Sequence, residues 1–406
     1  MKKVIVVGGG ISGFIAAINA KNENNNVVIL ERNNNPLKKL LITGNGKCNY
    51  FNELFDTSFY HSKNQEFLSL IINDANKDLA LNFFESIGIV PRIKDGYYYP
   101  FSNQAITMKN ALLKEIESKN IQLITNCYVK EITRKSDMFH IYTNNEDYIC
   151  DKLIISTGSK AYPKTGSDGS GYNFAKEFGH TINKVMPSLV GLKSNDKFIK
   201  DLSGVRCNVQ ISINDAVEKE YGQIQFTNYG LSGICVFNLS SVINSMLDNE
   251  EKVSIKINFL YDLEIYDLEN AYRLLNKINS KTNNRTIENL LDSLLDYKIT
   301  NVILKKLGID KTKGFTNLND NEIKLLLEHL ISFNVNIIGT NSFDNAQVCK
   351  GGITLTEINT STFESLIVPN LYFTGEILDV DGKCGGYNIA FATISAVLAG
   401  KDIAND

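Results

Sequence analysis

The sequence predicts an α/β fold, and three observations lead to this prediction. A short apolar run at residues 4–7 is typical of a strand buried on both faces, as in a parallel sheet. A glycine-rich segment follows at 8–13, and residues 14–21 then have a helical pattern. Further apolar runs of strand length occur at 27–30 and 153–155. The 406 residues, 43% of them hydrophobic and 21% charged, suffice for two or three globular domains.

The glycine-rich segment has the spacing G-x-G-x-x-G, which is typical of dinucleotide-binding loops. Gly8 allows a tight turn, Gly10 lets a pyrophosphate approach the backbone, and Gly13 allows close packing of helix on strand. The helix N-terminus offers N–H groups to the phosphates, and Glu31 is placed to accept hydrogen bonds from the adenosine ribose. The alternatives are a glycine turn without a ligand, and NAD in place of FAD. The predicted contacts are Gly8, Gly10, Ile11, Ser12, Gly13, Glu31 and Arg32.

Three later segments favour FAD, because NAD binding requires none of them. Residues 153–158 form an apolar strand that ends in Thr-Gly, after a predicted strand meander that begins at Val129. Residues 371–376 form a second strand that ends in Gly-Glu, where flavoproteins of the glutathione-reductase type bind a ribityl hydroxyl. Residues 385–388 precede a helix whose N-terminus would face the flavin N1/C2=O edge. The predicted contacts are Val129, Thr157, Gly158, Gly375, Glu376, Gly385, Gly386, Tyr387, Asn388 and Ile389.

With these motifs in view, the chain resembles the BaiN-like or aminoacetone-oxidase-like family of NAD(P)/FAD-dependent flavoproteins. The resemblance rests on the glycine loop and on KLLITGNGKCN, TGSKAYPKTGSDGSGY, PSLVGL, FTNYGLSG and GEILDVDGKCGGYN, which begin at residues 39, 157, 187, 226 and 375. The chain departs from the family at Asn228, Ile234 and Ala390, where His, Pro and Gln are usual. The resemblance adds Lys39, Gly44, Gly46, Cys48, Asn49 and Asp381 to the predicted cofactor contacts.

The resemblance also implies a domain organisation, in which a Rossmann-like FAD-binding domain of the glutathione-reductase type is interrupted. Its two parts are residues 1–191 and 349–406. A β-barrel-like insert would comprise 192–260 and 335–348, and a helical subdomain would comprise 261–334. Apolar periodicity in the subdomain predicts helices at 267–278, 286–297 and 321–333.

The activity that the resemblance implies is hydride transfer through flavin N5, in an FAD-dependent oxidoreductase that acts on a small molecule. We expect an NAD(P)H-linked reductase of a conjugated carbonyl compound, with nicotinamide bound transiently because only one G-x-G-x-x-G is present. The alternatives are oxidation of a small amine such as aminoacetone with peroxide release, a non-catalytic FAD-binding protein, and an RNA-modifying flavoprotein. Candidates for acid or polarising groups are Tyr162, Lys164, Asn228 and Tyr229.

Composition and charge also bear on the partners of the protein, its location and its metal content. The net charge of −3 disfavours nucleic acid as a partner, and the apolar segment 389–400 is too short to span a bilayer. The glycines of the first segment also argue against a signal peptide. Seven cysteines without a C-x-x-C spacing predict a reducing, cytoplasmic location, and no motif predicts a metal site.

Four further residues each have two possible roles. Cys48 and Cys384 are either redox thiols or small residues near the cofactor. Asp379 and Asp381 are either an acid–base pair or residues that hold a loop by hydrogen bonds. The oligomeric state is left open.

Overall fold

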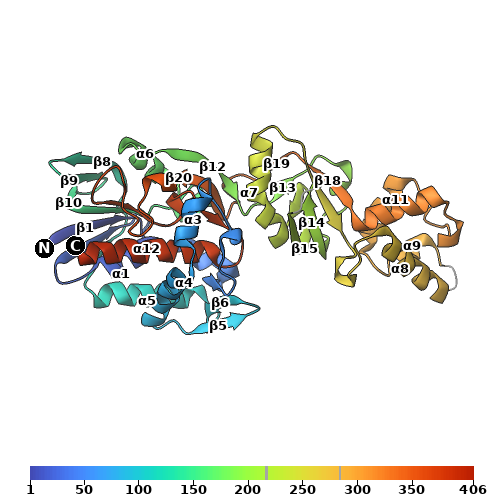
Figure 1. Ribbon diagram of the computed structural model, residues 1–406, viewed down its shortest axis with the longest axis horizontal. Helices are drawn as coiled ribbons and strands as arrows, with labels where there is room; N and C mark the ends of the chain where they lie inside the picture. Colours follow the sequence, from blue (N-terminus) through green and yellow to red (C-terminus); the bar gives the residue numbers. More distant parts are fainter. Residues whose placement is uncertain (215–217, 283–284) are drawn as a thin grey trace. The chain divides into compact units, whose positions relative to one another are not determined.

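The computed structural model describes residues 1–214, 218–282 and 285–406 (Figure 1). The chain forms two compact units. Unit 1 comprises residues 1–188 and 343–406, and unit 2 comprises residues 189–342. Each unit has its own hydrophobic core, so each is described by itself.

Unit 1 is built on a five-stranded parallel sheet, which confirms the predicted α/β class. Its order is β21 (Leu371–Phe373), β11 (Lys152–Ile155), β1 (Lys2–Val7), β2 (Asn25–Leu30) and β7 (Gln122–Ile124). From β1 the chain adds β2 and β7 on one side, and later β11 and β21 on the other. In such sheets ligands bind at the carboxyl edge where the strand order reverses, which here is between β1 and β11.

Two helices pack against each other beside this sheet, α1 (Ile11–Ala20) and the longer α12 (Tyr387–Asn405) (Figure 1). They run in the same direction, because Ser12 and Ala392 both contact Gly375, whereas Asn19 contacts Gly400. A Cβ at Gly400 would lie 2.5 Å from the Cβ of Asn19, so the helices approach as closely as glycine allows. The N-termini of α1 and α12 therefore lie at the same end of unit 1.

The rest of unit 1 consists of shorter elements around the sheet. The predicted meander is present as the three-stranded sheet β10–β9–β8. The bounds are α2 (Lys38–Ile42), β3 (Phe51–Asn52), β4 (Tyr60–His61), α3 (Gln65–Ile71), α4 (Asp74–Ser86), β5 (Pro91–Lys94), β6 (Tyr97–Pro100), α5 (Ala105–Ser118), β8 (Val129–Lys135), β9 (Met138–Thr143), β10 (Tyr148–Cys150), α6 (Ser170–Glu177), β12 (Ile182–Ser188), β20 (Val348–Ile353) and β22 (Asp381–Gly382).

Unit 2 contains a seven-stranded antiparallel sheet and five α-helices within its described residues. Because Ile338 alone separates the first strand of the sheet order from the last, the two ends of the sheet curl toward each other. The order is β18 (Phe333–Ile337), β17 (Val253–Asn258), β14 (Arg206–Ile213), β15 (Lys219–Thr227), β16 (Gly230–Ser232), β13 (Leu192–Lys193) and β19 (Gly339–Thr340); the helices are α7 (Ile234–Asp248), α8 (Leu268–Lys281), α9 (Ile287–Leu291), α10 (Tyr297–Leu307) and α11 (Asp320–Ile331).

The prediction of one helix over 286–297 is wrong. Helix α9 ends at Leu291, and the next helix begins only at Tyr297. The reason is local, since the Asp296 side chain accepts a hydrogen bond from the Lys298 N–H and caps a new helix at this point. Apolar periodicity continues across the break and concealed it.

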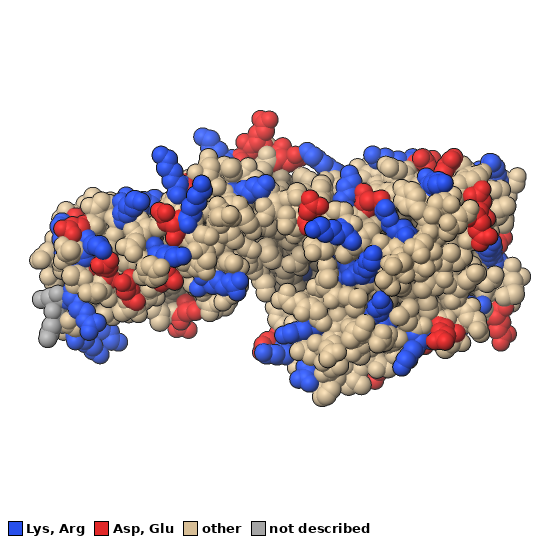
Figure 2. All heavy atoms as spheres, turned by 180° about the vertical axis from the view of Figure 1, so that it is seen from behind, with Lys and Arg blue, Asp and Glu red and all other residues tan. Residues whose placement is uncertain are grey.

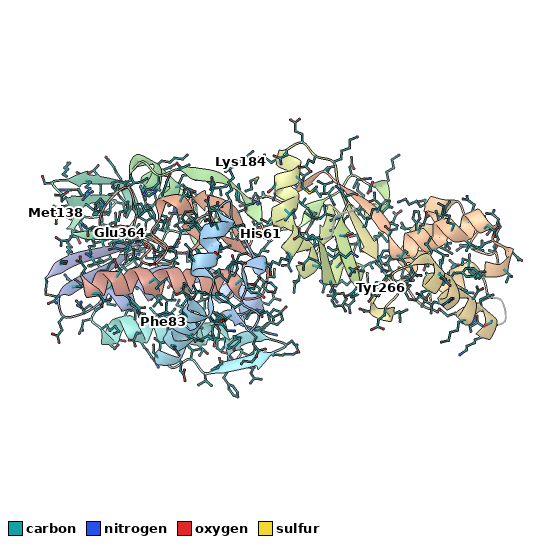
Figure 3. All side chains as sticks on the ribbon, viewed as in Figure 1. His61, Phe83, Met138, Lys184, Tyr266 and Glu364 are labelled. Carbon is teal, nitrogen blue, oxygen red and sulfur yellow. The ribbon has the colours of Figure 1, made fainter. Side chains whose placement is uncertain are left out.

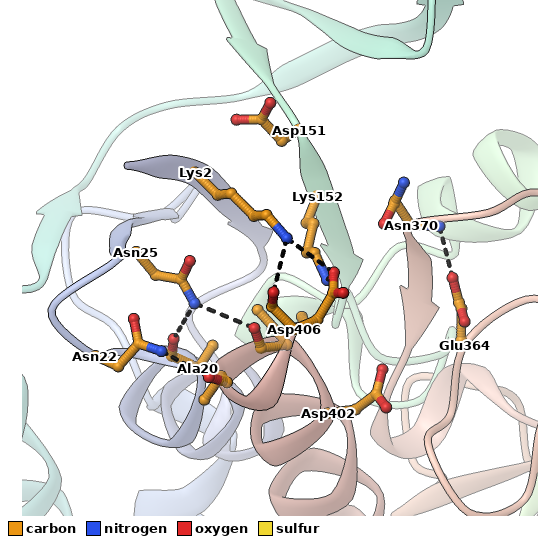
Figure 4. Close-up of polar contacts among 12 residues, drawn as sticks. Lys2, Ala20, Asn22, Asn25, Asp151, Lys152, Glu364, Asn370, Asp402 and Asp406 are labelled. Carbon is orange, nitrogen blue, oxygen red and sulfur yellow. Dashed lines mark hydrogen bonds and ion pairs between the residues drawn. The ribbon is translucent and has the colours of Figure 1, made fainter.

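Ion pairs and hydrogen bonds connect the C-terminal end of α12 to β1, β2 and β11 (Figure 4). The Asp406 carboxylate contacts Lys2 Nζ at 3.0 Å and Lys152 Nζ at 2.5 Å. Lys152 is buried, with 3% of its side chain exposed, whereas the Lys2 side chain is 42% exposed. The amide of Asn25 donates to the carbonyls of Ala20 and Ile403. Asp406 therefore supplies the counter-charge for a buried ammonium group.

We predict that Asp406→Asn lowers the free energy of unfolding by about 1–2 kcal/mol, because it removes the charged partner of Lys152. The matched control, Lys2→Met, should change stability by less than about 0.5 kcal/mol, because exposed pairs contribute little. Urea unfolding at neutral pH measures both values. Equal losses of unfolding free energy in the two variants would contradict the conclusion that the buried Lys152 depends on Asp406 for its counter-charge.

Candidate functional site

Four predicted residues follow the carboxyl ends of parallel strands in unit 1. Gly8 follows β1, Glu31 follows β2, Thr157 lies two residues beyond β11, and Gly375 lies two residues beyond β21. Because all these strands run in parallel, their carboxyl ends meet at one edge of the sheet. The structure thus brings together segments that are more than 300 residues apart in sequence.

The glycine loop combines two tight contacts with one open position. Gly8 has φ +112°, and a Cβ there would lie 2.4 Å from the Ser156 carbonyl oxygen. A Cβ at Gly13 would lie 2.0 Å from the Gly8 carbonyl oxygen, whereas a Cβ at Gly10 would meet no atom within 4 Å. Gly10 is also the N-cap of α1, and no side chain caps that terminus. The first N–H groups of α1, including those of Ile11 and Ser12, therefore border open space.

Glu31 is 6% exposed, and its carboxylate holds the loop together. One oxygen accepts from the Gly9 N–H at 2.7 Å, and the other accepts from the Asn33 backbone N–H and side-chain amide, both at 2.7 Å. A carboxylate has about four acceptor positions, so one is left for a ribose hydroxyl. The segment that leads to Val129 runs beside it, because the Cys127 N–H donates to the Glu31 carbonyl. Sequence reasoning missed Asn33, because it lies in an Asn run typical of a loop.

Arg32 lies at the start of the same loop, and its guanidinium is partly exposed. It forms an ion pair with Asp168 and hydrogen-bonds to the Gly166 carbonyl at 3.3 Å. The guanidinium also lies over the Tyr128 ring, 5.0 Å from its centroid. Arg32 thereby joins the end of β2 to the glycine-rich loop that follows Gly158.

Lys39 and Glu376, both predicted as cofactor contacts, form an ion pair of 2.5 Å. The second oxygen of Glu376 accepts from Ser159 Oγ at 2.6 Å and from the Cys349 N–H at 3.1 Å. The Glu376 side chain is 17% exposed, so it is positioned yet still accessible. Sequence reasoning did not assign Ser159, although it lies in the 157–172 motif.

A second loop, at 43–49, meets the N-terminus of α12. Gly44, Gly46 and Cys48 all have positive φ, and the buried Asn49 Oδ1 lacks a hydrogen-bond partner among the described residues. A Cβ at Gly386, the N-cap of α12, would lie 2.8 Å from this oxygen. No side chain caps α12, and its first turn, which includes Ile389, carries no acidic residue.

The residues around Gly386 are held in place by their neighbours. The Asn388 side chain accepts from the Gly382 N–H at 2.9 Å and donates to the Gly382 carbonyl at 2.7 Å. The buried Tyr387 ring stacks on Phe59 with centroids 4.7 Å apart. These contacts, and the positive φ of Gly385, fix the direction in which α12 begins.

Cys48 is fully buried, and burial raises the pKa of its thiol to about 12. A thiol with such a pKa is protonated at neutral pH and a poor nucleophile. The structure therefore favours the interpretation of Cys48 as a small residue at a close backbone approach. Cys384 is half-buried.

Two buried carboxylates lie two residues apart, Asp379 before β22 and Asp381 within it, beside His61 of β4 (labelled in Figure 3). Asp379 accepts from the Lys63 N–H at 3.1 Å and from the Asn183 amide at 2.7 Å, and burial raises its pKa. Asp381 accepts from Ser188 Oγ at 2.8 Å and lies 3.6 Å from His61 Nδ1, its partner across β4 and β22. Sequence reasoning missed His61, because nothing near it in sequence points to a site 320 residues away.

The four candidate catalytic residues belong to different units. Tyr162 and Lys164 lie in unit 1, in the loop after β11, where the Tyr162 N–H donates to the Phe343 carbonyl at 2.9 Å. Asn228 and Tyr229 form the turn between β15 and β16 in unit 2. Lys164 and Asn228 are exposed, and Tyr162 and Tyr229 are half-buried. Their roles stay predictions.

The residues present fit a dinucleotide cofactor. Gly10 and Gly386 leave two helix N-termini without side-chain caps at the same end of unit 1. Asn49 Oδ1 and Thr157 Oγ1 are buried polar atoms without a partner among the described residues. Buried polar atoms are rarely left unpaired in proteins, so these two atoms mark places for an additional group. In the described ranges, no cluster of His, Cys, Asp or Glu is arranged to hold a metal ion. The described helices include none that is both long and apolar enough to cross a membrane.

Comparison with known proteins identifies the family, since the HI0933-like protein Rossmann domain matches residues 2–402. The chain belongs to this family. It is 33% identical to the 3-dehydro-bile acid delta(4,6)-reductase of Clostridium scindens, over 99% of this chain and 98% of that protein. It is 27% identical to the ribosomal RNA dihydrouridine synthase of Escherichia coli, over 98% and 97% of the two chains. Membership confirms the resemblance inferred from the motifs and the assignment as an oxidoreductase.

Among solved structures, the chain is similar to the 3-ketosteroid-delta4-(5alpha)-dehydrogenase of Rhodococcus jostii RHA1 in complex with 4-androstene-3,17-dione. It is 10% identical to this chain, with a TM-score of 0.49 over 100% of this chain and 97% of that chain.

We predict that Gly10→Val impairs FAD binding, whereas Gly13→Ala impairs the stability of the fold. Gly10→Val should keep the thermal stability of the apoprotein, because its side chain enters open space, but should weaken FAD binding about a hundredfold or more. Gly13→Ala should destabilise the fold by about 1–3 kcal/mol, because its Cβ would collide with backbone. Flavin titration and thermal unfolding of the apoprotein measure the two effects. The control Gly339→Ala, whose Cβ would meet no atom within 4 Å, should change neither.

The buried Asp379 predicts a pH dependence of stability. Because burial raises the pKa of its carboxyl in the folded state, its ionisation costs stability as the pH rises through that value. Both of its hydrogen bonds end on one oxygen, which an Asn side chain can reproduce. Asp379→Asn should therefore raise Tm by a few degrees at pH 8 and by less at pH 4. A difference in Tm that is the same at both pH values would contradict this explanation.

Proposed function

We propose that the chain binds FAD non-covalently and reduces a C=C bond conjugated to a carbonyl group. The observation that carries the cofactor assignment is the pair of uncapped helix N-termini, α1 and α12, at one end of unit 1. A single helix N-terminus suits the pyrophosphate of either dinucleotide. The second one suits the electron-rich N1/C2=O edge of a flavin.

The residues that would hold FAD are those already described at the carboxyl edge of the sheet. Gly10 and the first N–H groups of α1 would face the pyrophosphate, and Glu31 would accept from the adenosine ribose. Glu376, positioned by Lys39 and Ser159, would accept from the ribityl chain. The bound flavin would supply hydride transfer at N5.

The names of two relatives support the type of bond that is reduced. One is named as a delta(4,6)-reductase of a 3-dehydro-bile acid, and the other as a synthase of dihydrouridine in ribosomal RNA. The 5,6 double bond of uridine is conjugated to its C4 carbonyl, so both names describe reduction of a C=C bond next to a carbonyl. The substrate common to both is an enone-like group.

Side chains of the protein would protonate the substrate carbon and polarise its carbonyl group. The Tyr162 hydroxyl and the Lys164 ammonium are hydrogen-bond donors for the carbonyl, and Asn228 and Tyr229 are the candidates in unit 2. Asp379, whose pKa burial raises, is the candidate proton donor in unit 1. NAD(P)H, bound transiently, is the proposed electron donor.

Anaerobic stopped-flow measurements test the proposal. The purified protein should be yellow, and NADH or NADPH should bleach its flavin absorbance within seconds. A Δ4-3-ketosteroid or a uridine oligonucleotide should then restore the absorbance at least about tenfold faster than buffer. Gly10→Val protein is the control without flavin. If aminoacetone instead reduces the enzyme and yields peroxide, the chain is an amine oxidase. If FAD binds but no donor reduces it, the chain is a non-catalytic flavin-binding protein, and either result contradicts the proposal.

A further inference from the structure

Strand β6 carries three consecutive tyrosines, which are divided between its two faces. The Tyr98 ring packs in the interior, since its centroid lies 6.1 Å from that of the buried Tyr50 and 6.0 Å from that of the buried Phe51. Successive side chains of a strand point to opposite faces. Tyr97 and Tyr99 therefore lie on the other face, and both are half-buried. Neither belongs to a motif that predicts cofactor contacts.

This second face of β6 borders the region where α12 begins (Figure 1). A Cβ at Gly385 would lie 3.2 Å from Cε1 of Tyr97, and a Cβ at Gly44 would lie 3.8 Å from Cε1 of Tyr99. Both glycines have positive φ, and both are predicted cofactor contacts. The two rings are therefore adjacent to the loop at 43–49 and to the segment that leads into α12.

Asn49 lies between Tyr99 and the N-terminus of α12. The Cβ of Asn49 and Cε1 of Tyr99 lie 3.7 Å and 3.8 Å from the same point, which is the position of a Cβ at Gly44. The Oδ1 of Asn49 lies 2.8 Å from the position of a Cβ at Gly386, the N-cap of α12. This buried oxygen has no hydrogen-bond partner among the described residues. The protein therefore offers, in spatial order, a helix N-terminus, an amide oxygen and the side chain of Tyr99.

The Tyr99 hydroxyl is available as a hydrogen-bond donor. In the part of the chain that the structure describes, no other group is hydrogen-bonded to it. Burial raises the pKa of this phenol, with smaller contributions from Tyr97 and Asp95. The phenol therefore keeps its proton at neutral pH and can share it with an acceptor.

The pyrimidine edge of a flavin presents N1 and C2=O, then N3–H, and then C4=O, which are an acceptor pair, a donor and an acceptor. The groups of the protein have the complementary order. We propose that Asn49 Oδ1 accepts a hydrogen bond from the flavin N3–H and that the Tyr99 hydroxyl donates to C4=O. The inference rests on the proposed binding of FAD, and it adds to the site a tyrosine from outside the sequence motifs.

A donor at C4=O favours the reduced flavin, because electron density on this oxygen increases on reduction. Remote charges contribute little to this effect. On the side of the molecule seen in Figure 2, Lys and Arg are interspersed with Asp and Glu. Exposed charges are also screened over about 10 Å at 0.1 M salt. Loss of the Tyr99 hydroxyl should therefore change the equilibrium between oxidised and reduced FAD.

Reduction of the FAD-loaded protein together with a reference dye tests the role of Tyr99. Tyr99→Phe keeps the ring and removes the donor, so it should shift the equilibrium about tenfold toward oxidised FAD. The matched control is Tyr98→Phe, which removes a hydroxyl from the same strand on the opposite face and should behave like the wild type. Tm and the amount of bound FAD, recorded for each variant, show that the fold is intact.

Binding of 3-methyl-FAD, which lacks the N3–H, tests the role of Asn49. The wild type should bind it about tenfold more weakly than FAD, because the buried Oδ1 of Asn49 then stays unpaired. Asn49→Ala removes this oxygen and should bind the two flavins with equal affinity. Titration of the apoprotein, followed by flavin fluorescence, measures both Kd values.

These measurements need no substrate, so they separate the inference from the proposed reaction. The inference is overturned if Tyr99→Phe leaves the equilibrium unchanged, if the wild type does not prefer FAD to 3-methyl-FAD, or if Asn49→Ala keeps that preference. If the expected results are obtained but no conjugated C=C bond is reduced, the proposed function fails and the inference stands. A protein that takes up no FAD overturns both.

Discussion

The direct passage of a buried parallel strand into a helix is the constraint on which unit 1 depends. The backbone of α1 comes so close to the end of β1 that a methyl group at Gly13 would overlap the Gly8 carbonyl. This contact places the first turn of α1 at the carboxyl edge of the sheet. The close packing of α12 on α1, which Gly400 permits, then places a second N-terminus at the same end. The positive ends of two helix dipoles thus share one region of the molecule.

Carboxylates around this region are held by hydrogen bonds from other groups of the protein. Glu31 is bound by Gly9 and Asn33, and Glu376 by Lys39, Ser159 and Cys349. Because these side chains are already positioned, a cofactor that binds there would not have to order them, which reduces the entropy lost on binding. Asp379 differs from them, since burial opposes its charge. Unit 1 therefore combines fixed acceptors with a carboxyl group that keeps its proton more readily.

Unit 2 follows a different principle, because its sheet buries one face only. Apolar and polar residues alternate along β14, as expected for an antiparallel strand with one face in a core. The helices predicted by periodicity are present as α8 and α11, but the break at Asp296 divides the third. A capping side chain acts over two residues, whereas periodicity is read over a window of ten or more, so the break was hidden.

The sequence by itself determined the local parts of the site. The order of strand, glycine loop and helix at 4–21, the acid at position 31 and the uncapped start of α12 follow from backbone geometry and from patterns a few residues long. Only the tertiary structure decided which distant groups meet: Lys39 with Glu376, Asp381 with His61, and Asp406 with the buried Lys152. Such pairs depend on the strand order and on helix packing. Strand order and helix packing depend on how much apolar surface the whole unit buries, and a short segment of sequence does not determine this.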